Sequence, residues 1–260
     1  MTTKRLKTRV AMNGWDDHRF QGYAIYADLL GRTTTSQLLA LSLGMKLSHE
    51  EGQLLDEMIV SSALADPHIW PLKLTRVAGA YGGSIVTGLA AGLLSAEGPV
   101  TGAGPVTPMA QLLYRLGTLD SHAAIRDVHA MLDAGQRLPG FGVAARKVDE
   151  RVVAISRCVV ARGRDTQRYW RLWTLIAEQT RSRGVEPNIA SAFTAAALDL
   201  GFPPERVEPL FLLALLPCFL PNAVEGAEQQ PEVLQSLPSD DLEYLGHQRR
   251  ASSRATFARS

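Results

Sequence analysis

The sequence is poor in several features that would assign a protein to a class at once. It has only two cysteines, Cys158 and Cys218, which lie far apart without the spacing of a disulfide or metal framework. They fit buried thiols in a reducing compartment, which favours a cytoplasmic protein. Its charge is nearly balanced, with 27 Lys and Arg against 26 Asp and Glu. This balance argues against a nucleic-acid-binding protein, which would carry a basic excess.

Several catalytic signatures are missing as well. The chain has no phosphate-binding loop and no dinucleotide fingerprint, and its serines lack the setting of a nucleophile elbow. His122 and His129 are too widely spaced for a zinc site, which prefers i, i+4 pairs with further ligands, so we expect no metal. The N-terminus lacks an apolar stretch after its basic residues and does not resemble a signal peptide. Those residues suit a solvated tail or, alternatively, a phosphate contact (Lys4, Arg5, Lys7 and Arg9).

Helical periodicity dominates what is present. The only good strand candidate is residues 20–26, where aromatic and branched residues lie between turn-like flanks. A capping-box pattern at Ser48 and Glu51 opens one helix, and Thr35 or Ser36 suits the cap of the helix before it. Apolar spacing and turn residues predict further helices (35–43, 48 to the break at 66–67, from 71, 107–116, 121–134, 149–160, 165–183, 187–200 and 203–216). The chain is therefore predicted to be all-α, with a sizeable core.

Residues 77–96 contain no charged side chain. Their length alone would allow a membrane span. Five closely spaced glycines would let neighbouring helices approach closely, and no second span accompanies the segment (Gly79, Gly82, Gly83, Gly88 and Gly92). We therefore predict a buried central helix rather than a membrane segment.

The helix predicted over 165–183 carries an unusual number of arginines. Its apolar face contains Tyr169, Leu172, Trp173 and Ile176. The arginines suit a solvated face, and the alternative is a patch that binds phosphate or an acidic partner (Arg164, Arg168, Arg171, Arg181 and Arg183).

Five short segments, in order and at similar spacing, resemble the citrate synthase family and its short relatives, the citryl-CoA lyases. They cover roughly residues 20–250 and include a glycine-arginine segment before a leucine-rich helix, a Gly-Pro turn and a Pro-Gly-Phe-Gly loop (22–43, 98–102, 139–143, 149–151 and 186–190). The resemblance implies an all-α, citrate synthase-like fold. It further implies a large domain of residues 1–102 and 203–260, a small domain of residues 103–202, and a homodimer.

The family's chemistry relies on side chains that this sequence has replaced. In the family one histidine hydrogen-bonds the developing enolate, an aspartate removes the proton next to the thioester carbonyl, and a second histidine polarises the oxoacid carbonyl. By the resemblance these positions are Thr101, Ala190 and Val143. A further substrate histidine falls on Asp66, and the later substrate-binding arginines fall near Leu215 and Leu237. Arg151 is the retained carboxylate-binding position.

The loop around Gly140 is the candidate cofactor site by resemblance. The family holds adenine and thioester there, largely through backbone groups, and places a basic residue on the cofactor phosphate. The corresponding residues are Pro139, Gly140, Phe141, Gly142, Val143, Arg146 and Lys147. A coenzyme A thioester is therefore a possible substrate, with no tightly bound cofactor expected. The alternative is that the glycines only turn the chain between helices.

Asp66 and His68 place a carboxylate and an imidazole together at a break before the uncharged segment. If the fold is right, this break faces the cleft. His68 is then a candidate acid-base group that replaces the missing ones. The alternative is a capping Asp66 with a hydrogen-bonded structural His68.

Two functions follow from these positions. The first is a catalytically diverged relative that binds an acyl-CoA, a small carboxylate or only a protein partner, without ordinary citrate chemistry. The second is an acyl-CoA carbon–carbon lyase or acyltransferase that uses non-standard residues, with Asp66, His68, Thr101 and Arg151 as candidates. We expect neither a nucleic-acid nor a membrane partner.

Overall fold

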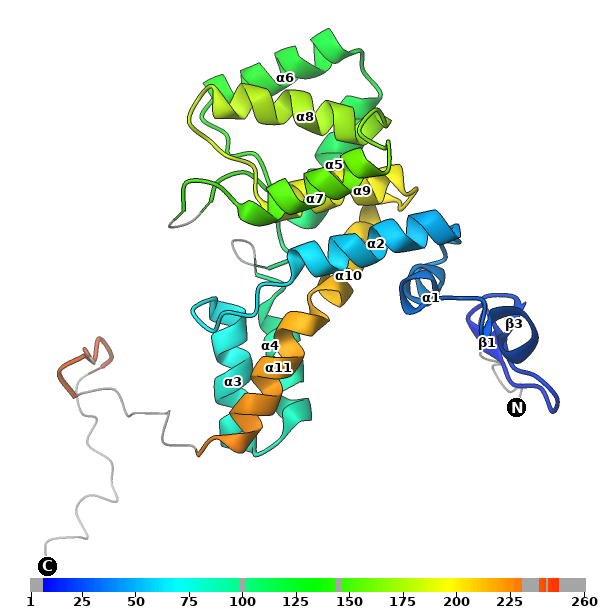
Figure 1. Cartoon of the computed structure of the whole chain (residues 1–260). Coiled ribbons are helices and arrows are strands. Elements are labelled where there is room, and N and C mark those ends of the chain that lie inside the picture. The colour runs from blue at the N-terminus through cyan, green and yellow to red at the C-terminus, as the bar shows by residue number, and fades with distance from the viewer. Residues whose placement is uncertain (1–6, 99–101, 144–145, 231–238, 242, 248–260) are drawn as a thin grey trace, which may run out of the picture.

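The computed structural model describes residues 7–98, 102–143, 146–230, 239–241 and 243–247. It is a helical protein with one small sheet near the N-terminus (Figure 1), so the all-α prediction is confirmed. The helices are α1 (Thr35–Ser42), α2 (His49–Ser62), α3 (Trp70–Gly82), α4 (Ile85–Ser95), α5 (Val106–Gly117), α6 (Ser121–Asp133), α7 (Glu150–Ala161), α8 (Arg168–Arg181), α9 (Ile189–Asp199), α10 (Pro204–Ala214) and α11 (Leu216–Glu228), followed by a 3₁₀ turn, η3 (Ser239–Asp241).

The strand predicted over 20–26 is only partly correct. The sheet is antiparallel and consists of β1 (Ala11–Met12), β2 (Arg19–Phe20) and β3 (Tyr23–Ala24). Positive φ angles at Gln21 and Gly22 turn the chain between β2 and β3, as a two-residue hairpin requires. The chain then enters a π-helix, η1 (Ile25–Leu29).

Most predicted helix starts are right to within one residue. Ser48 and Glu51 form the predicted capping box at α2. Thr34, rather than Thr35 or Ser36, caps α1 through a second capping box with Gln37. In α8 the prediction begins too early, because residues 162–167 form turns before the helix starts at Arg168.

The helix α11 was not predicted, because Pro217 and Pro221 suggested that helical structure ended at residue 216. Pro217 lies at the start of α11, where a backbone N–H is not needed. Together α10 and α11 form a run, Pro204–Glu228, that is long and apolar enough to span a membrane, and 44% of its most apolar window is buried in the protein. Core helices have the same composition, so this run is weak support for a membrane span.

The uncharged segment is two helices rather than one, and the prediction of a buried central helix is wrong for the single chain. Gly83 adopts a left-handed conformation and ends α3. In α4 only Gly88 and Gly92 are buried. Those two glycines allow α4 to lie directly on α3, since a Cβ at Gly88 would be 2.7 Å from the Thr75 carbonyl oxygen. The outer face of α4 remains exposed and apolar (Ile85, Val86 and Leu94).

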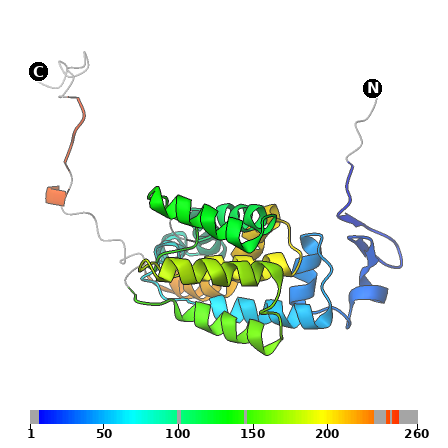
Figure 2. The ribbon, with the colours of Figure 1, turned by 90° about the horizontal axis from the view of Figure 1, so that it is seen from above.

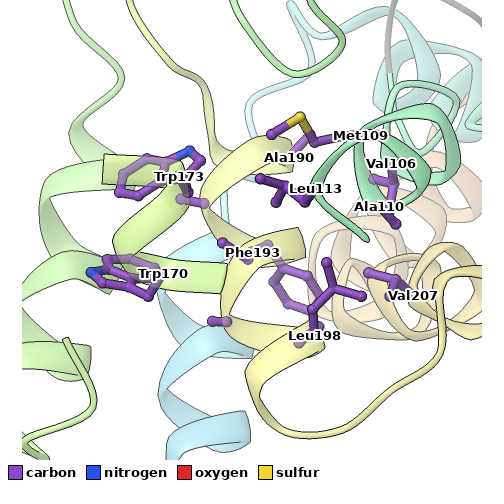
Figure 3. Close-up of a cluster of buried hydrophobic side chains, with 14 of the residues drawn as sticks. Val106, Met109, Ala110, Leu113, Trp170, Trp173, Ala190, Phe193, Leu198 and Val207 are labelled. Atoms are coloured by element: carbon purple, nitrogen blue, oxygen red, sulfur yellow. The ribbon is translucent and has the colours of Figure 1, made fainter. Parts of the chain in front are cut away.

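Two hydrophobic clusters hold these helices. The larger one joins α1 and α2 to α5–α10, and α9 lies at its centre with every residue from Ile189 to Leu198 buried (Figure 3). The smaller cluster joins α3, α11 and the end of α4 (Leu72, Ala96, Cys218 and Phe219). Figure 1 shows α3, α4 and α11 as a bundle below the larger body, and in Figure 2, which looks down on the molecule, the same helices lie behind it. The domain division at residues 103–202 stays a prediction.

Both cysteines are free thiols, as predicted, but only Cys218 is buried and Cys158 is partly exposed. Burial raises the pKa of both thiols. Neither is therefore set up as a thiolate nucleophile.

Candidate functional site

Two of the sequence segments come together at the N-terminus of α9. The amide of Gly142 donates to the Glu186 carbonyl at 2.7 Å, and the amide of Asn188 donates to the Gly140 carbonyl at 3.0 Å. The Asn188 side chain also donates to the Gly142 carbonyl at 3.0 Å. The loop containing Gly140 is thus bonded along its length to the segment that opens α9.

Gly140 makes this junction possible. Its φ is +73°, and a Cβ there would lie 2.8–3.0 Å from Ser191 atoms at the start of α9. Ser191 is itself fixed, because its hydroxyl accepts from the Trp173 indole at 3.0 Å and donates to the Asn188 carbonyl at 2.9 Å. Position 140 therefore requires glycine on two counts, a left-handed backbone and a close contact.

Asp149 and Arg151 form the best-organised polar group of the site. The buried carboxylate of Asp149 accepts from Nε and Nη2 of Arg151, both at 2.8 Å, and from the amide of Ile189 at 2.9 Å. Burial opposes ionisation of this carboxyl, but the hydrogen bonds and charge of Arg151 and the Ile189 amide outweigh it and lower its pKa. Asp149 therefore aims Arg151 and ties α7 to α9, while Nη1 of Arg151 bonds to no other described residue.

The positions that the sequence resemblance assigns to the family's aspartate and second histidine hold apolar side chains. Ala190 is 5% exposed and belongs to the same cluster as Met109 and Leu113 (Figure 3). Val143 is partly buried directly after the loop. Neither side chain can exchange a proton or donate a hydrogen bond. Thr101 and Leu237 lie outside the described residues, and Leu215 lies at the bend between α10 and α11.

Asp66 and His68 pair with each other. Oδ1 of Asp66 accepts from the His68 amide at 2.9 Å and lies 2.6 Å from Nδ1 of the imidazole. These bonds, followed by the charges of His68 and Arg146, lower the pKa of Asp66. The carboxylate folds a local turn instead of capping α3, whose N-cap is Ile69. The His68 side chain is 93% exposed, so the pair is accessible to solvent and near enough to Arg146 to sense its charge.

The predicted cofactor residues fall into two groups in the structure, the loop residues and the basic residues that follow the loop. The amides of Phe141 and Gly142 donate within the chain, and the carbonyls of Gly140 and Gly142 accept within it. These groups are used by the loop itself. Arg146 and Lys147 are exposed beyond it, and Arg146 forms an ion pair with Glu150 one helical turn away. Anion recognition at this site would therefore depend on the basic side chains.

Sequence reasoning missed Asp149, Asn188 and Ser191 as organisers of the site. Asp149 entered the sequence analysis as the first residue of the helix predicted over 149–160 and as part of a three-residue match, although an Asp before a helical pattern is a cap signal in its own right. Among the described residues no group of three or more His, Cys, Asp or Glu side chains could hold a metal ion.

Comparison with known proteins places this geometry in context. The family profile described as "Citrate synthase, C-terminal domain" matches residues 14–233. The structure is similar to citryl-CoA lyase from Hydrogenobacter thermophilus, with 20% identity over 96% of this chain and 98% of that chain and a TM-score of 0.81. No curated protein matches the sequence.

Larger proteins contain the same fold. ATP citrate lyase from Methanothrix soehngenii, solved with citrate and coenzyme A, matches at 18% identity and a TM-score of 0.74 over 98% of this chain and 43% of its own. Citrate synthase from Thermoplasma acidophilum, solved with carboxymethyl coenzyme A and oxaloacetate, matches at 17% identity and a TM-score of 0.64 over 85% of this chain and 59% of its own. At sequence identities this low, the similarity shows a shared fold only.

Proposed function

Because the chain belongs to the citrate synthase family, we propose that it is a diverged member that binds an acyl-CoA or a small carboxylate without performing ordinary citrate chemistry. One observation carries the proposal. A well-formed loop and an aimed arginine adjoin two apolar side chains, Val143 and Ala190, at the positions that the sequence resemblance assigns to the family's second histidine and its aspartate.

The loss of those two groups is large on the scale of enzyme rates. A positioned general base contributes a factor of roughly 10²–10⁴, and a donor to a developing oxyanion a comparable one. Alanine and valine supply neither. Thr101 can donate one hydrogen bond, yet a hydroxyl is not an acid at neutral pH.

Ligand recognition is the function that the remaining residues support. Arg151 keeps Nη1 for a carboxylate because Asp149 uses only Nε and Nη2. Arg146 and Lys147 are exposed cations beyond the loop, suited to the phosphates of a coenzyme A thioester. Relatives of this fold have been solved with coenzyme A and with citrate or oxaloacetate, which supports this ligand class.

The test is the thermal midpoint of the purified protein with coenzyme A, acetyl-CoA, oxaloacetate or citryl-CoA. A ligand at 100 times its dissociation constant adds about 2.7 kcal/mol of stability, or roughly 5 °C or more for a chain of this size. We expect a shift with at least one coenzyme A species, and a smaller one in Lys147→Glu. Lys147 is exposed, so this variant should fold normally. If none of the four compounds shifts the midpoint, the ligand-binding proposal is wrong.

The alternative is a lyase or acyltransferase that uses the Asp66–His68 pair, and the 2.6 Å contact between the two side chains favours it. In that case His68→Asn would abolish turnover of an acyl-CoA substrate while leaving the midpoint unchanged, because the imidazole is almost fully exposed. Equal turnover by the variant and the natural chain would exclude this role.

We further propose that the protein is a cytoplasmic homodimer. Residues 77–96, in α3 and α4, contain no charged side chain. Several of their apolar side chains are exposed (Tyr81, Ile85, Val86 and Leu94). Such a patch is typical of an interface between subunits.

A further inference from the structure

A groove on the side of α7 and α8 is separate from the loop and arginine site described above. Both helices pack against α9, while α7 makes its other main contact with α2 and α8 with α5 and α6 (Figure 1). Between α7 and α8 two adjoining hollows of about 480 and 470 Å³ share Ser156, Val160 and Arg181. The hollows therefore form one groove that runs along the helices.

The floor and walls of the groove are largely apolar. Trp170 and Trp173, whose ring centres lie 4.7 Å apart, are buried at its base. Val153 and Val160 are 43% and 57% exposed on α7. Burying the two exposed valines would favour an apolar occupant by roughly 25 cal/mol for each Å² covered. The two indoles are already buried and add little to this gain.

The rim of the groove is cationic. Arg157, Arg171 and Arg181 line it, against one acidic residue, Asp165. Arg181 is paired with Glu186. The side chains of Arg157 and Arg171 are exposed, and they form no hydrogen bond or ion pair with another residue in the described ranges.

The structure also shows what most of the arginines around α8 contact. The sequence alone allowed either a solvated face or a patch that binds an acidic partner. Arg164 binds Glu51 and the Asp199 carbonyl, Arg168 binds the Gly117 carbonyl, and Arg183 binds Asp133. These three serve the fold. Arg171 remains and is joined by Arg157, which comes from the neighbouring helix and was not part of the sequence pattern.

We propose that this groove is a docking site for a short, acidic, amphipathic helix of a partner protein. Its apolar residues would cover Val153 and Val160, above the buried tryptophan pair, and its carboxylates would pair with Arg157 and Arg171. The groove follows α7, whose twelve residues span about 18 Å, so it matches three turns of a helix. Its open, extended form suits the helix-in-groove mode of recognition rather than enclosure of a small molecule.

Charge argues against α4 of a second copy of this chain as the occupant. The most apolar exposed helix of the protein, α4, has no charged residue. It would leave the arginines at the rim of the groove without partners and remove them from water, which is costly. An acidic amphipathic helix would both cover the apolar surface and pair its carboxylates with the arginines.

The test uses a fluorescein-labelled 16-residue peptide with leucines at i, i+3, i+4 and i+7 and glutamates elsewhere. A second peptide of the same length has lysines in place of the glutamates. Anisotropy would be measured with the full chain and with three variants. Arg157→Glu/Arg171→Glu reverses the rim, Val160→Asp places a charge in the wall, and Arg126→Glu is a matched control on α6, where the arginine is also exposed.

We expect saturable binding of the acidic peptide that weakens at least tenfold in the double variant and in Val160→Asp. The control should bind as the natural chain does, and added salt should weaken binding, as it does for exposed charge pairs. Several results would overturn the proposal: no saturable binding, equal binding of the lysine peptide, or a loss in Arg126→Glu equal to that in the double variant. Circular dichroism of each variant separates lost binding from lost folding.

Discussion

At the scale of single residues, Asp149 connects local sequence to the site. Its carboxylate caps α7, holds Arg151 and accepts from the first amide of α9. One buried side chain thus sets the direction of the arginine and the distance between two helices. We regard it as a positioning residue, because it acts on any ligand through Arg151.

Replacing Asp149 with asparagine should lower the free energy of unfolding by about 3 kcal/mol at pH 7, since the change leaves Arg151 without its ionised partner. The pKa of Asp149 is lowered in the folded protein from an ordinary value of 3.8. Its contribution is therefore present above that value and disappears as the pH falls through the folded pKa. Urea unfolding at pH 7 and in acid would show the gap between the two proteins narrowing; a gap that stays constant would contradict this account of the ion pair.

Gly140→Ala should destabilise the protein by about 2 kcal/mol or more, because it combines a left-handed backbone with a clash against α9. Gly135→Ala is the matched control, since its φ of +71° is nearly the same and no atom lies within 4 Å of the added Cβ. Thermal unfolding of both variants separates backbone strain from contact. Equal losses would mean that the contact with Ser191 contributes nothing.

At the scale of elements, a helix could be predicted from the sequence when the interactions that form it lie close together in the chain. The capping box of Ser48 and Glu51 lies within four residues, and its helix was predicted correctly. The helix α11 was missed because Pro221 opposes it locally. It forms nonetheless because Phe219 and Cys218 bury their side chains against α3, and Asn222 bonds the Ala65 carbonyl. Tertiary packing here overrides local propensity.

The candidate site shows the same division. The segments around Gly140 and Asn188 were both identified from the sequence, but the hydrogen bonds that join them connect residues more than forty positions apart. The sequence pattern identified the two segments but not the hydrogen bonds between them. The free Nη1 of Arg151 and the internal use of the loop amides follow only from coordinates.

The bundle of α3, α4 and α11 depends on glycine contacts. Gly88→Ala should destabilise it by about 2–3 kcal/mol even though alanine is the better helix former by about 1 kcal/mol, because the added methyl meets the Thr75 carbonyl. Ala90→Gly, at an exposed position of the same helix, should cost only the propensity difference. Thermal unfolding would compare them, and a stabilised Gly88→Ala protein would show that the two helices are not held at this distance.

At the scale of the whole molecule, the exposed apolar face of α4 is the surface on which the proposed homodimer depends. If a second copy covers that face, Val86→Asp/Leu94→Asp should convert a dimer into a monomer with unchanged helicity, since both side chains are about three-quarters exposed in the single chain. Val60→Asp, at a valine of similar exposure on α2, is the control. Sedimentation velocity would measure the masses. A monomeric natural chain, or equal dissociation by the control, would contradict the dimer.

We infer that the site around Gly140 and Arg151 has kept ligand recognition and lost the groups that move protons. The most direct measurement is turnover of citryl-CoA by the purified chain, followed as release of oxaloacetate. The account predicts release no faster than in buffer alone, at citryl-CoA concentrations that raise the thermal midpoint. Sustained release that depends on enzyme concentration would contradict it, and loss of that release in His68→Asn would assign the chemistry to the Asp66–His68 pair.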